Sequence, residues 1–194
     1  FAKPQQKKEQ EVTVRKVTRV PFIQMIYPIP AANDEDIISI KALMDILVNN
    51  SSSRVKEHLK QKQRLILEAG SNVQGLRKEG FALLYLIPTS EQLVDRVRNS
   101  FDHQLQRIKR KGITAEELEI VKKNSLKTMI FNQRDTGTKA NILAQGVVRF
   151  DNPELYKEQL STLKNLTEAD IVAAAKKYFK QQDRTIGYIL PKKQ

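Results

Sequence analysis

The side chains that could do chemistry in this chain are few. There are two histidines, His58 and His103, and no cysteine. Neither histidine has a second one at helical spacing, so the inverted zinc motif H-x-x-E-H, whose histidines bind the metal and whose glutamate activates water, is absent. The two could meet in space and recruit a carboxylate. However, each lies in a charged helical segment and catalytic zinc needs three protein ligands, so surface or packing roles are the simpler interpretation.

Nucleophilic catalysis and phosphate binding lack their usual motifs as well. The chain contains no G-x-S-x-G sequence, no G-x-G-x-x-G and no Walker-type lysine loop. Ser51, Ser52 and Ser53 precede a helical pattern, where serine hydroxyls typically satisfy the free amides of a helix start. Without cysteine, disulfides and thiolate metal sites are excluded. These residue types predict no catalytic residue and no metal ligand in this chain.

The charge of the chain is strongly basic, with a formal net charge of +12 and a pI near 9.8. Such a balance favours acidic partners such as nucleic acid, anionic lipid or acidic peptides. Basic residues are nevertheless spread over several predicted helices with acidic residues among them, and 106–112 is the one dense run. A basic pI alone is a weak indication of nucleic-acid binding, so we favour a solvated basic surface. No apolar run approaches the roughly 20 residues that span a bilayer.

The helices and strands that would position these residues are predicted from the spacing of apolar residues and from capping and turn residues. Residues 1–11 are polar and lysine-rich and predict a linker, and 12–194 predict a single domain. Alternating or β-branched runs predict strands, and capping residues before apolar-periodic runs predict helices. Strands are expected at 12–17 (an edge strand), 20–31, 64–74, 80–89 and 183–191. Helices are expected at 33–49, 55–61, 90–111 with Ser90 as cap, from Thr114 onward with an interruption at 136–138, from Asn152, and at 167–179.

The order of these elements predicts an α+β fold. Strands 64–74 and 80–89 are sequential, as in an antiparallel hairpin, whereas the first and last strands are far apart. Regular strand–helix alternation, which a fully parallel sheet would need, is missing. We therefore expect a mostly antiparallel sheet of four to five strands with about six helices packed on one face.

Residues 166–191 read LTEADIVAAAKKYFKQQDRTIGYILP, a capped helix, a polar turn and a closing strand. This order resembles the closing unit of the insulinase and pitrilysin-type zinc peptidases, the group that includes mitochondrial processing peptidase. Residues 49–72 resemble the serine-arginine turn, helix and strand of that family's second half, and Pro4, Gln5 and Gln6 match its interdomain linker. Family subunits consist of two similar halves, one carrying H-x-x-E-H. The resemblance covers nearly the whole chain and implies a metallopeptidase half-domain, the non-zinc-binding C-terminal one.

The resemblance also points to substrate-binding positions. Competent second halves place an arginine late in the helix after the serine-arginine turn and a tyrosine seven residues later, and this pair holds the peptide and its developing oxyanion at the zinc site. Aligned on the turn that ends in Arg54, the two positions are Lys60 and Leu67. Leu67 cannot donate a hydrogen bond, and Lys60 keeps the charge but loses the bidentate fork. We expect substrate contacts from Lys60, Leu67 and Arg54, without a transition-state role.

The strand at 64–74 allows two interpretations. In the family, a sheet edge near the catalytic chamber pairs with extended peptide by β-augmentation. A strand with Leu65 and Leu67 on one face is equally typical of a core strand. The sequence leaves both open.

The function that the resemblance implies is that of a non-catalytic half of a zinc metalloendopeptidase, inactive alone, which shapes the substrate chamber and contacts peptide. Its partners would be the N-terminal half of the same subunit, which would hold the zinc, a second peptidase subunit in a dimer, and the peptide substrate. The chain lacks an initiating Met and a signal peptide, which indicates a fragment; a bacterial periplasm or envelope is implied by the resemblance alone. The alternative is a basic binding or scaffold module for an acidic partner, nucleic acid or an anionic membrane surface.

Overall fold

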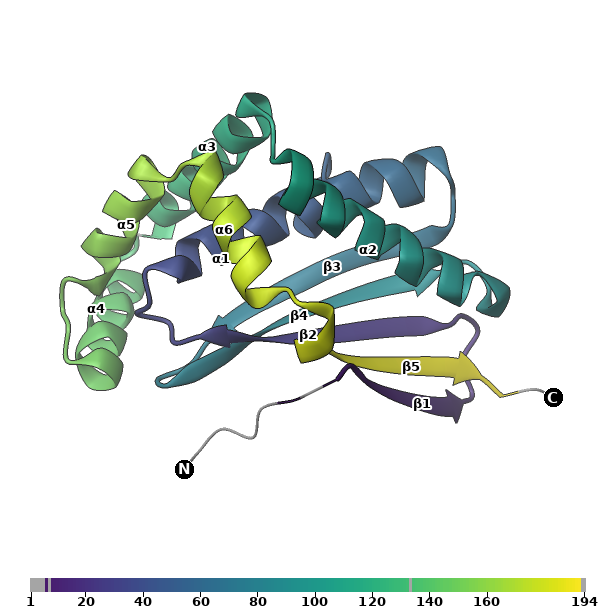
Figure 1. Cartoon of the computed structure of the whole chain (residues 1–194). Coiled ribbons are helices and arrows are strands. Elements are labelled where there is room, and N and C mark those ends of the chain that lie inside the picture. Colours follow the sequence, from purple (N-terminus) through teal and green to yellow (C-terminus); the bar gives the residue numbers. More distant parts are fainter. Residues whose placement is uncertain (1–5, 7, 133, 193–194) are drawn as a thin grey trace.

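The sheet of this domain joins strands that are far apart in the sequence. The computed structural model describes residues 6, 8–132 and 134–192 (Figure 1). Its five strands lie in the order β1-β5-β2-β4-β3, with β1 parallel to β5 and the other neighbours antiparallel. The mostly antiparallel sheet is confirmed, as is the edge position of the first strand. The strands are β1 (Gln10–Lys16), β2 (Phe22–Pro30), β3 (Ile66–Gly75), β4 (Glu79–Pro88) and β5 (Thr185–Pro191).

The helices cover one face of the sheet, as expected for this α+β class (Figure 1). Six are α-helices and four are short π or 3-10 segments among the described residues. The α-helices are α1 (Asp36–Met44), α2 (Val94–Lys111), α3 (Ala115–Asn132), α4 (Thr136–Phe150), α5 (Leu155–Asn165) and α6 (Glu168–Tyr178). The π segments are η1 (Asp45–Asn49) and η2 (Lys56–Lys62), and the 3-10 segments are η3 (Glu91–Leu93) and η4 (Gln181–Asp183).

The core lies between the sheet and α1. Strand β2 sends alternate side chains to opposite faces, so that Ile23, Met25 and Tyr27 are buried beneath the helices. Helix α1 is buried on nearly all sides because it contacts β3 and is flanked by α5 and α6. Its sequence, which is apolar except at Asp36, Ser39 and Lys41, is therefore that of a central helix rather than of a helix with one half exposed to solvent.

Local sequence signals fix several helix ends. Thr114 Oγ1 accepts from the Glu117 amide at 3.1 Å, and Glu117 Oε2 accepts from the Thr114 amide at 2.7 Å, which confirms the predicted capping box. Thr167 and Asp170 form a second box at the start of α6. Gly112 ends α2 with φ +73°, a conformation that side chains with a Cβ rarely adopt.

Two predicted helix boundaries differ from the structure. Ser90 lies at the N-terminal position of η3, but its side chain makes no capping hydrogen bond. The interruption of the long helix precedes 136–138, because α4 already begins at Thr136. Asp135 is the residue that caps it, with Oδ2 accepting from the Thr138 amide at 2.6 Å. A carboxylate satisfies the free amide and complements the helix dipole, which explains the earlier start.

The helices expected at 33–49 and 55–61 are present but contain π-helical turns. The Asn50 amide donates to the Asp45 carbonyl at 3.1 Å, and the Gln63 amide donates to the His58 carbonyl at 3.1 Å, both with a five-residue separation. Apolar periodicity does not distinguish one wide turn from an ordinary one, so the sequence predicts only a helix there. Such turns are frequent at functional sites.

The first strand begins at Gln10, two residues earlier than predicted and within the stretch predicted as a linker. Gln10 and Glu11 belong to β1, where they lie opposite Thr185 and Ile186 of β5. The pairing of β1 with β5 satisfies backbone groups that a free linker would leave to water. Residues 1–5 and 7, including Pro4 and Gln5 of the predicted linker match, lie outside the described residues.

A buried arginine ties β1 and β5 to the helical layer. The side chain of Arg184 is 1% exposed, contacts Glu9 and Asp102 in ion pairs, and donates to the Tyr27 hydroxyl at 3.1 Å. Its Nη2 also donates to Asp102 Oδ2 at 2.8 Å. Burial alone would lower the pKa of Arg184, but the hydrogen bonds to Asp102 raise it above its ordinary value. Burial has the opposite effect on Tyr27, because it disfavours the charged phenolate, and raises the pKa of this residue to about 12.

Candidate functional site

Lys60 and Leu67, which the sequence predicts as substrate contacts, lie on adjoining elements at the edge of the sheet. Lys60 is near the end of η2, and its Nζ lies 2.5 Å from Glu68 Oε2. Lys56 Nζ lies 3.7 Å from the other oxygen of the same carboxylate. The hydrogen bond from Lys60 and that from the Ala69 amide hold the pKa of Glu68 below its usual range. These contacts join η2 to Glu68 near the start of β3.

Leu67 is the extra residue of a β-bulge. Ile66 lies opposite Pro88 and Glu68 lies opposite Ile87, so that Leu67 has no partner of its own on β4. Its side chain is 48% exposed, whereas that of Leu65 is 4% exposed. The two leucines therefore do not share a core face. Bulges re-aim side chains and are frequent at sheet edges near active sites, which gives this exposed leucine a defined direction.

Arg54, the third predicted contact, is engaged within the domain. Its guanidinium donates to both carboxylate oxygens of Glu117, at 2.6 and 2.7 Å, and to the Gly112 carbonyl at 3.1 Å. Burial opposes ionisation of Glu117, but the hydrogen bonds from Arg54 hold its pKa below the usual range. Arg54 thus joins the start of η2 to the turn between α2 and α3. A contact of Arg54 with substrate stays a prediction.

Along the edge of β3, side-chain oxygens already accept hydrogen bonds from backbone amides. Ser71 donates from its amide to Asn49 Oδ1 at 2.8 Å and from its hydroxyl to the same oxygen at 3.0 Å. The Ala69 amide donates to Glu68 Oε1 at 3.0 Å. Because a strand repeats every two residues, the Val73 amide points to the same edge. The edge is therefore blocked at Ala69 and Ser71 by groups that a pairing peptide would displace.

Glu68 and Asn49 are the members of this site that sequence reasoning missed. Lys60 and Glu68 are eight positions apart, which is not the spacing of a side-chain pair within one helix. The sequence therefore does not indicate that they form an ion pair. Asn49 is 22 positions from Ser71, and it reads as an ordinary residue at a helix end. Only the packing of η1 and η2 against β3 brings these groups together.

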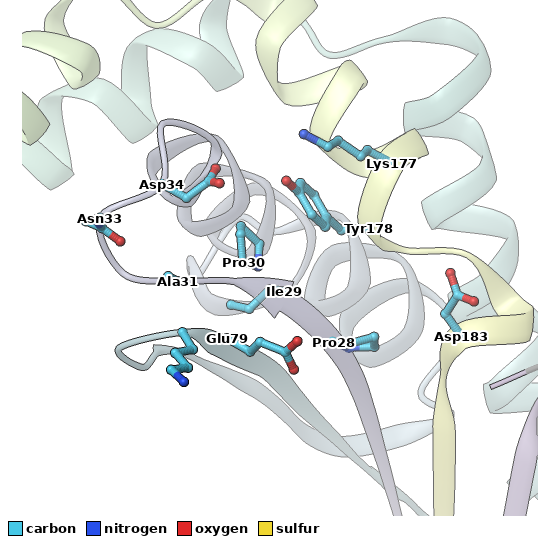
Figure 2. Close-up of a pocket in the computed structure, with 11 residues that line it drawn as sticks. Pro28, Ile29, Pro30, Ala31, Asn33, Asp34, Glu79, Lys177, Tyr178 and Asp183 are labelled. Carbon is cyan, nitrogen blue, oxygen red and sulfur yellow. The ribbon is translucent and has the colours of Figure 1, made fainter. Parts of the chain in front are cut away.

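A hollow lies at the C-terminal end of β2 (Figure 2). Its volume is about 590 Å3, and α6, the segment before α1 and the β3–β4 turn contribute to its walls. Figure 2 shows Lys177 and Tyr178 directed from α6 toward the start of α1. There Asp36 Oδ2 accepts from Lys177 Nζ at 2.7 Å and from the Tyr178 hydroxyl at 2.8 Å. These polar groups join two helices, so we assign them a structural role.

The two histidines lie in a third place, where His58 and His103 line one hollow between η2 and α2. The described part of the chain contains no group of three histidine, cysteine, aspartate or glutamate side chains placed to hold a metal ion. A zinc site with three protein ligands therefore has no counterpart among these residues.

Comparison with known proteins places this geometry in a family. The family model described as "Peptidase M16 inactive domain" matches residues 1–125. The zinc protease PqqE of Helicobacter pylori is 26% identical over 170 residues, which cover 88% of this chain and 38% of that protein. The chain thus spans less than half the length of this relative. It belongs to the M16 peptidase family as an inactive, C-terminal domain, which confirms the resemblance stated above.

Solved structures share the fold. A protease from Helicobacter pylori has a TM-score of 0.89 at 23% identity, with 97% of this chain and 45% of that chain covered. The periplasmic protease PqqL from Escherichia coli has a TM-score of 0.78 at 19% identity, with 96% of this chain and 21% of that chain covered. None of the helices in the described ranges has the length and apolar character needed to cross a membrane.

Proposed function

We propose that this domain holds peptide against the edge of β3 while a preceding half of the same protein carries the zinc and performs the hydrolysis. The observation that carries the proposal is the bulge at Leu67, which places an exposed apolar side chain at a sheet edge, next in the chain to Glu68, the ion-pair partner of Lys60. Family membership and the zinc-protease name of the PqqE relative support a peptidase parent. The same family membership favours this reading over a basic binding module.

The three predicted contacts have different roles in this proposal. Leu67 offers an apolar surface to a peptide side chain, and Lys60 offers a cation that Glu68 holds in place. Arg54 positions η2 through Glu117 and reaches peptide only if that pair opens. None of the three is placed to activate water. We propose no hydrolysis by this domain alone, in keeping with its description as an inactive domain.

The remaining assignments concern the whole protein. The chain covers 38% of PqqE, so we propose that the zinc-bearing half precedes β1 and that residues 1–9 link the two halves. Residues 10–194 would then form the half-domain. We further propose that two such subunits pair, with the partner supplying the arginine and tyrosine that this chain lacks. A bacterial, periplasmic location is proposed from the description of PqqL.

The test of peptide holding is a substitution at the bulge. Leu67→Ser should weaken the binding of an extended peptide about ten-fold, because a partly buried leucine contact contributes about 1.5 kcal/mol. Binding would be followed by amide shifts of Ala69, Ser71 and Val73 on the labelled 194-residue chain. Stability should change little, since the side chain is exposed in the free domain.

A matched control is Leu76→Ser, at a leucine of 38% exposure just after β3. It should leave peptide affinity unchanged. Equal affinity for Leu67→Ser and the unsubstituted chain would refute the proposed site. Stoichiometric zinc together with peptide cleavage by this chain alone would refute the non-catalytic role.

A further inference from the structure

The hollow that His58 and His103 share is not part of the β3 edge. Its volume is about 590 Å3, within the range of ligand pockets. One wall comes from η2 and the residue after it, and the other from η3 and α2. The wall residues on α2 recur at helical spacing, as Arg96, Asn99 and His103 do, so that one stripe of this helix faces the hollow.

The lining of this hollow is rich in carboxamides and nearly neutral. Asp95 and Arg96 are its charged residues and offset each other, in a chain whose net charge is +12. Each carboxamide provides two N–H donors and a carbonyl acceptor, and an uncharged imidazole provides one donor and one acceptor. The amide residues of the lining are Gln63, Gln92, Asn99 and Gln104.

Gln104 is the residue that marks the hollow as a binding site. It is 1% exposed, and its Nε2 has no hydrogen-bond partner among the described residues. An unpaired buried donor destabilises the folded state, and native proteins retain few of them. The neighbouring buried positions of α2, Phe101, Leu105 and Ile108, are apolar. A leucine at 104 would therefore suit the fold better than glutamine, which indicates that the amide serves a ligand.

We propose that this hollow binds a short extended peptide segment through its main-chain groups, with the carboxamide of Gln104, turned toward the hollow, hydrogen-bonding to a main-chain group of the segment. A peptide group is itself an amide, with one donor and one acceptor, and so matches a wall of carboxamides and imidazoles. The near-neutral lining offers no excess of charge to an ionic ligand. The site adds a second peptide contact to the β3 edge and rests on the proposed peptide-holding function.

Histidine labelling tests this proposal directly, because the chain has two histidines and both line the hollow. The probe is a capped, uncharged peptide of alanine, serine and glycine, titrated into the labelled 194-residue chain. Both imidazole signals should shift with one common Kd. Gln104→Leu should weaken that Kd about ten-fold, the loss of a hydrogen bond to a buried carboxamide. It should leave the protein as stable or more stable, since the unpaired donor is gone.

The control is Gln106→Leu, at an exposed position of the same helix outside the lining, which should leave the Kd unchanged. Unmoved imidazole signals, or an unchanged Kd in Gln104→Leu, would overturn the inference. The two proposals separate cleanly. Shifts at the Val73 amide without imidazole shifts support the β3 edge and overturn the hollow, and the reverse pattern supports the hollow and overturns the edge.

Discussion

The two edges of the sheet are held by different means. At one edge, β1 is exposed along its length, pairs with β5 and adds charged contacts: Arg98 pairs with Glu11 at 2.8 Å, Arg15 pairs with Glu91 at 2.7 Å, and the buried Arg184 anchors the adjacent Glu9. At the other edge, β3 begins at the buried Ile66, just after the buried Leu65, and then presents the exposed bulge and side-chain-capped amides.

The contrast indicates that the β1 edge has a structural role, whereas the β3 edge can exchange its side-chain contacts for contacts with a peptide. The side chain of Arg184 is buried, so opening the cluster and removing its acidic partners would leave a buried charge unpaired, which is strongly unfavourable. Lys60 and Glu68 each keep 41% of their side-chain surface exposed, so their ion pair contributes little and can be replaced. The peptide site is therefore expected at the β3 edge, and the domain's integrity at the β1 edge.

The largest expected effect is at the β1 edge. Arg184→Met removes the cation that Glu9, Asp102 and Tyr27 share, and should lower the free energy of unfolding by about 3 kcal/mol or more. Urea unfolding followed by circular dichroism measures it. Arg107→Met, at an exposed position of α2, serves as control and should change stability by less than about 0.5 kcal/mol. Similar stabilities for the two variants would remove the structural assignment of this edge.

A smaller effect is expected from uncapping β3. Asn49→Ala leaves the Ser71 amide without its side-chain acceptor, and should cost about 1 kcal/mol of stability while speeding hydrogen exchange at that amide. The freed edge should also pair more readily with peptide. Asn50→Ala is the neighbouring control. If hydrogen exchange at the Ser71 amide is as slow in Asn49→Ala as in the unsubstituted chain, Asn49 does not protect this amide.

The smallest effect concerns pH. The folded pKa of Glu68 lies below its unfolded value, so its contribution is complete above about pH 4.3 and is lost as pH falls through the folded pKa. The change should amount to less than about 1 kcal/mol, because the pair is exposed. A carboxyl NMR titration checks it. Lys60→Met should raise the pKa of Glu68 toward its usual value, whereas Lys62→Met, whose partner is Glu57, should not.

Features that depend on residues close together in the sequence were predictable. The capping box at Thr114, the helix end at Gly112 and the aromatic and β-branched run of β2 each depend on residues close in the chain. Together with the order of the elements they gave the α+β class, and the serine-arginine turn located η2 and β3. These signals work because local backbone preferences and one-sided burial agree along these segments.

Features that depend on distant partners were not predictable. Arg184 reads as a polar residue before a strand, yet its partners lie 82, 157 and 175 positions away. The bulge at Leu67 depends on the register with β4, and a register offset of one residue moves a side chain to the other face. The unpaired amide of Gln104 is likewise a property of packing, since an isolated glutamine in a charged helix looks solvated.

The position of β5 has a consequence for how the molecule is made. This strand lies between β1 and β2, although it follows them by more than 150 residues of chain. During synthesis on a ribosome, β1 therefore emerges early and must wait without its neighbour until residues 185–191 have left the exit tunnel. Such long-range pairing slows folding and leaves strand edges open to wrong partners in the meantime. The charged residues along β1 then also protect the nascent chain from aggregation before its fold is complete.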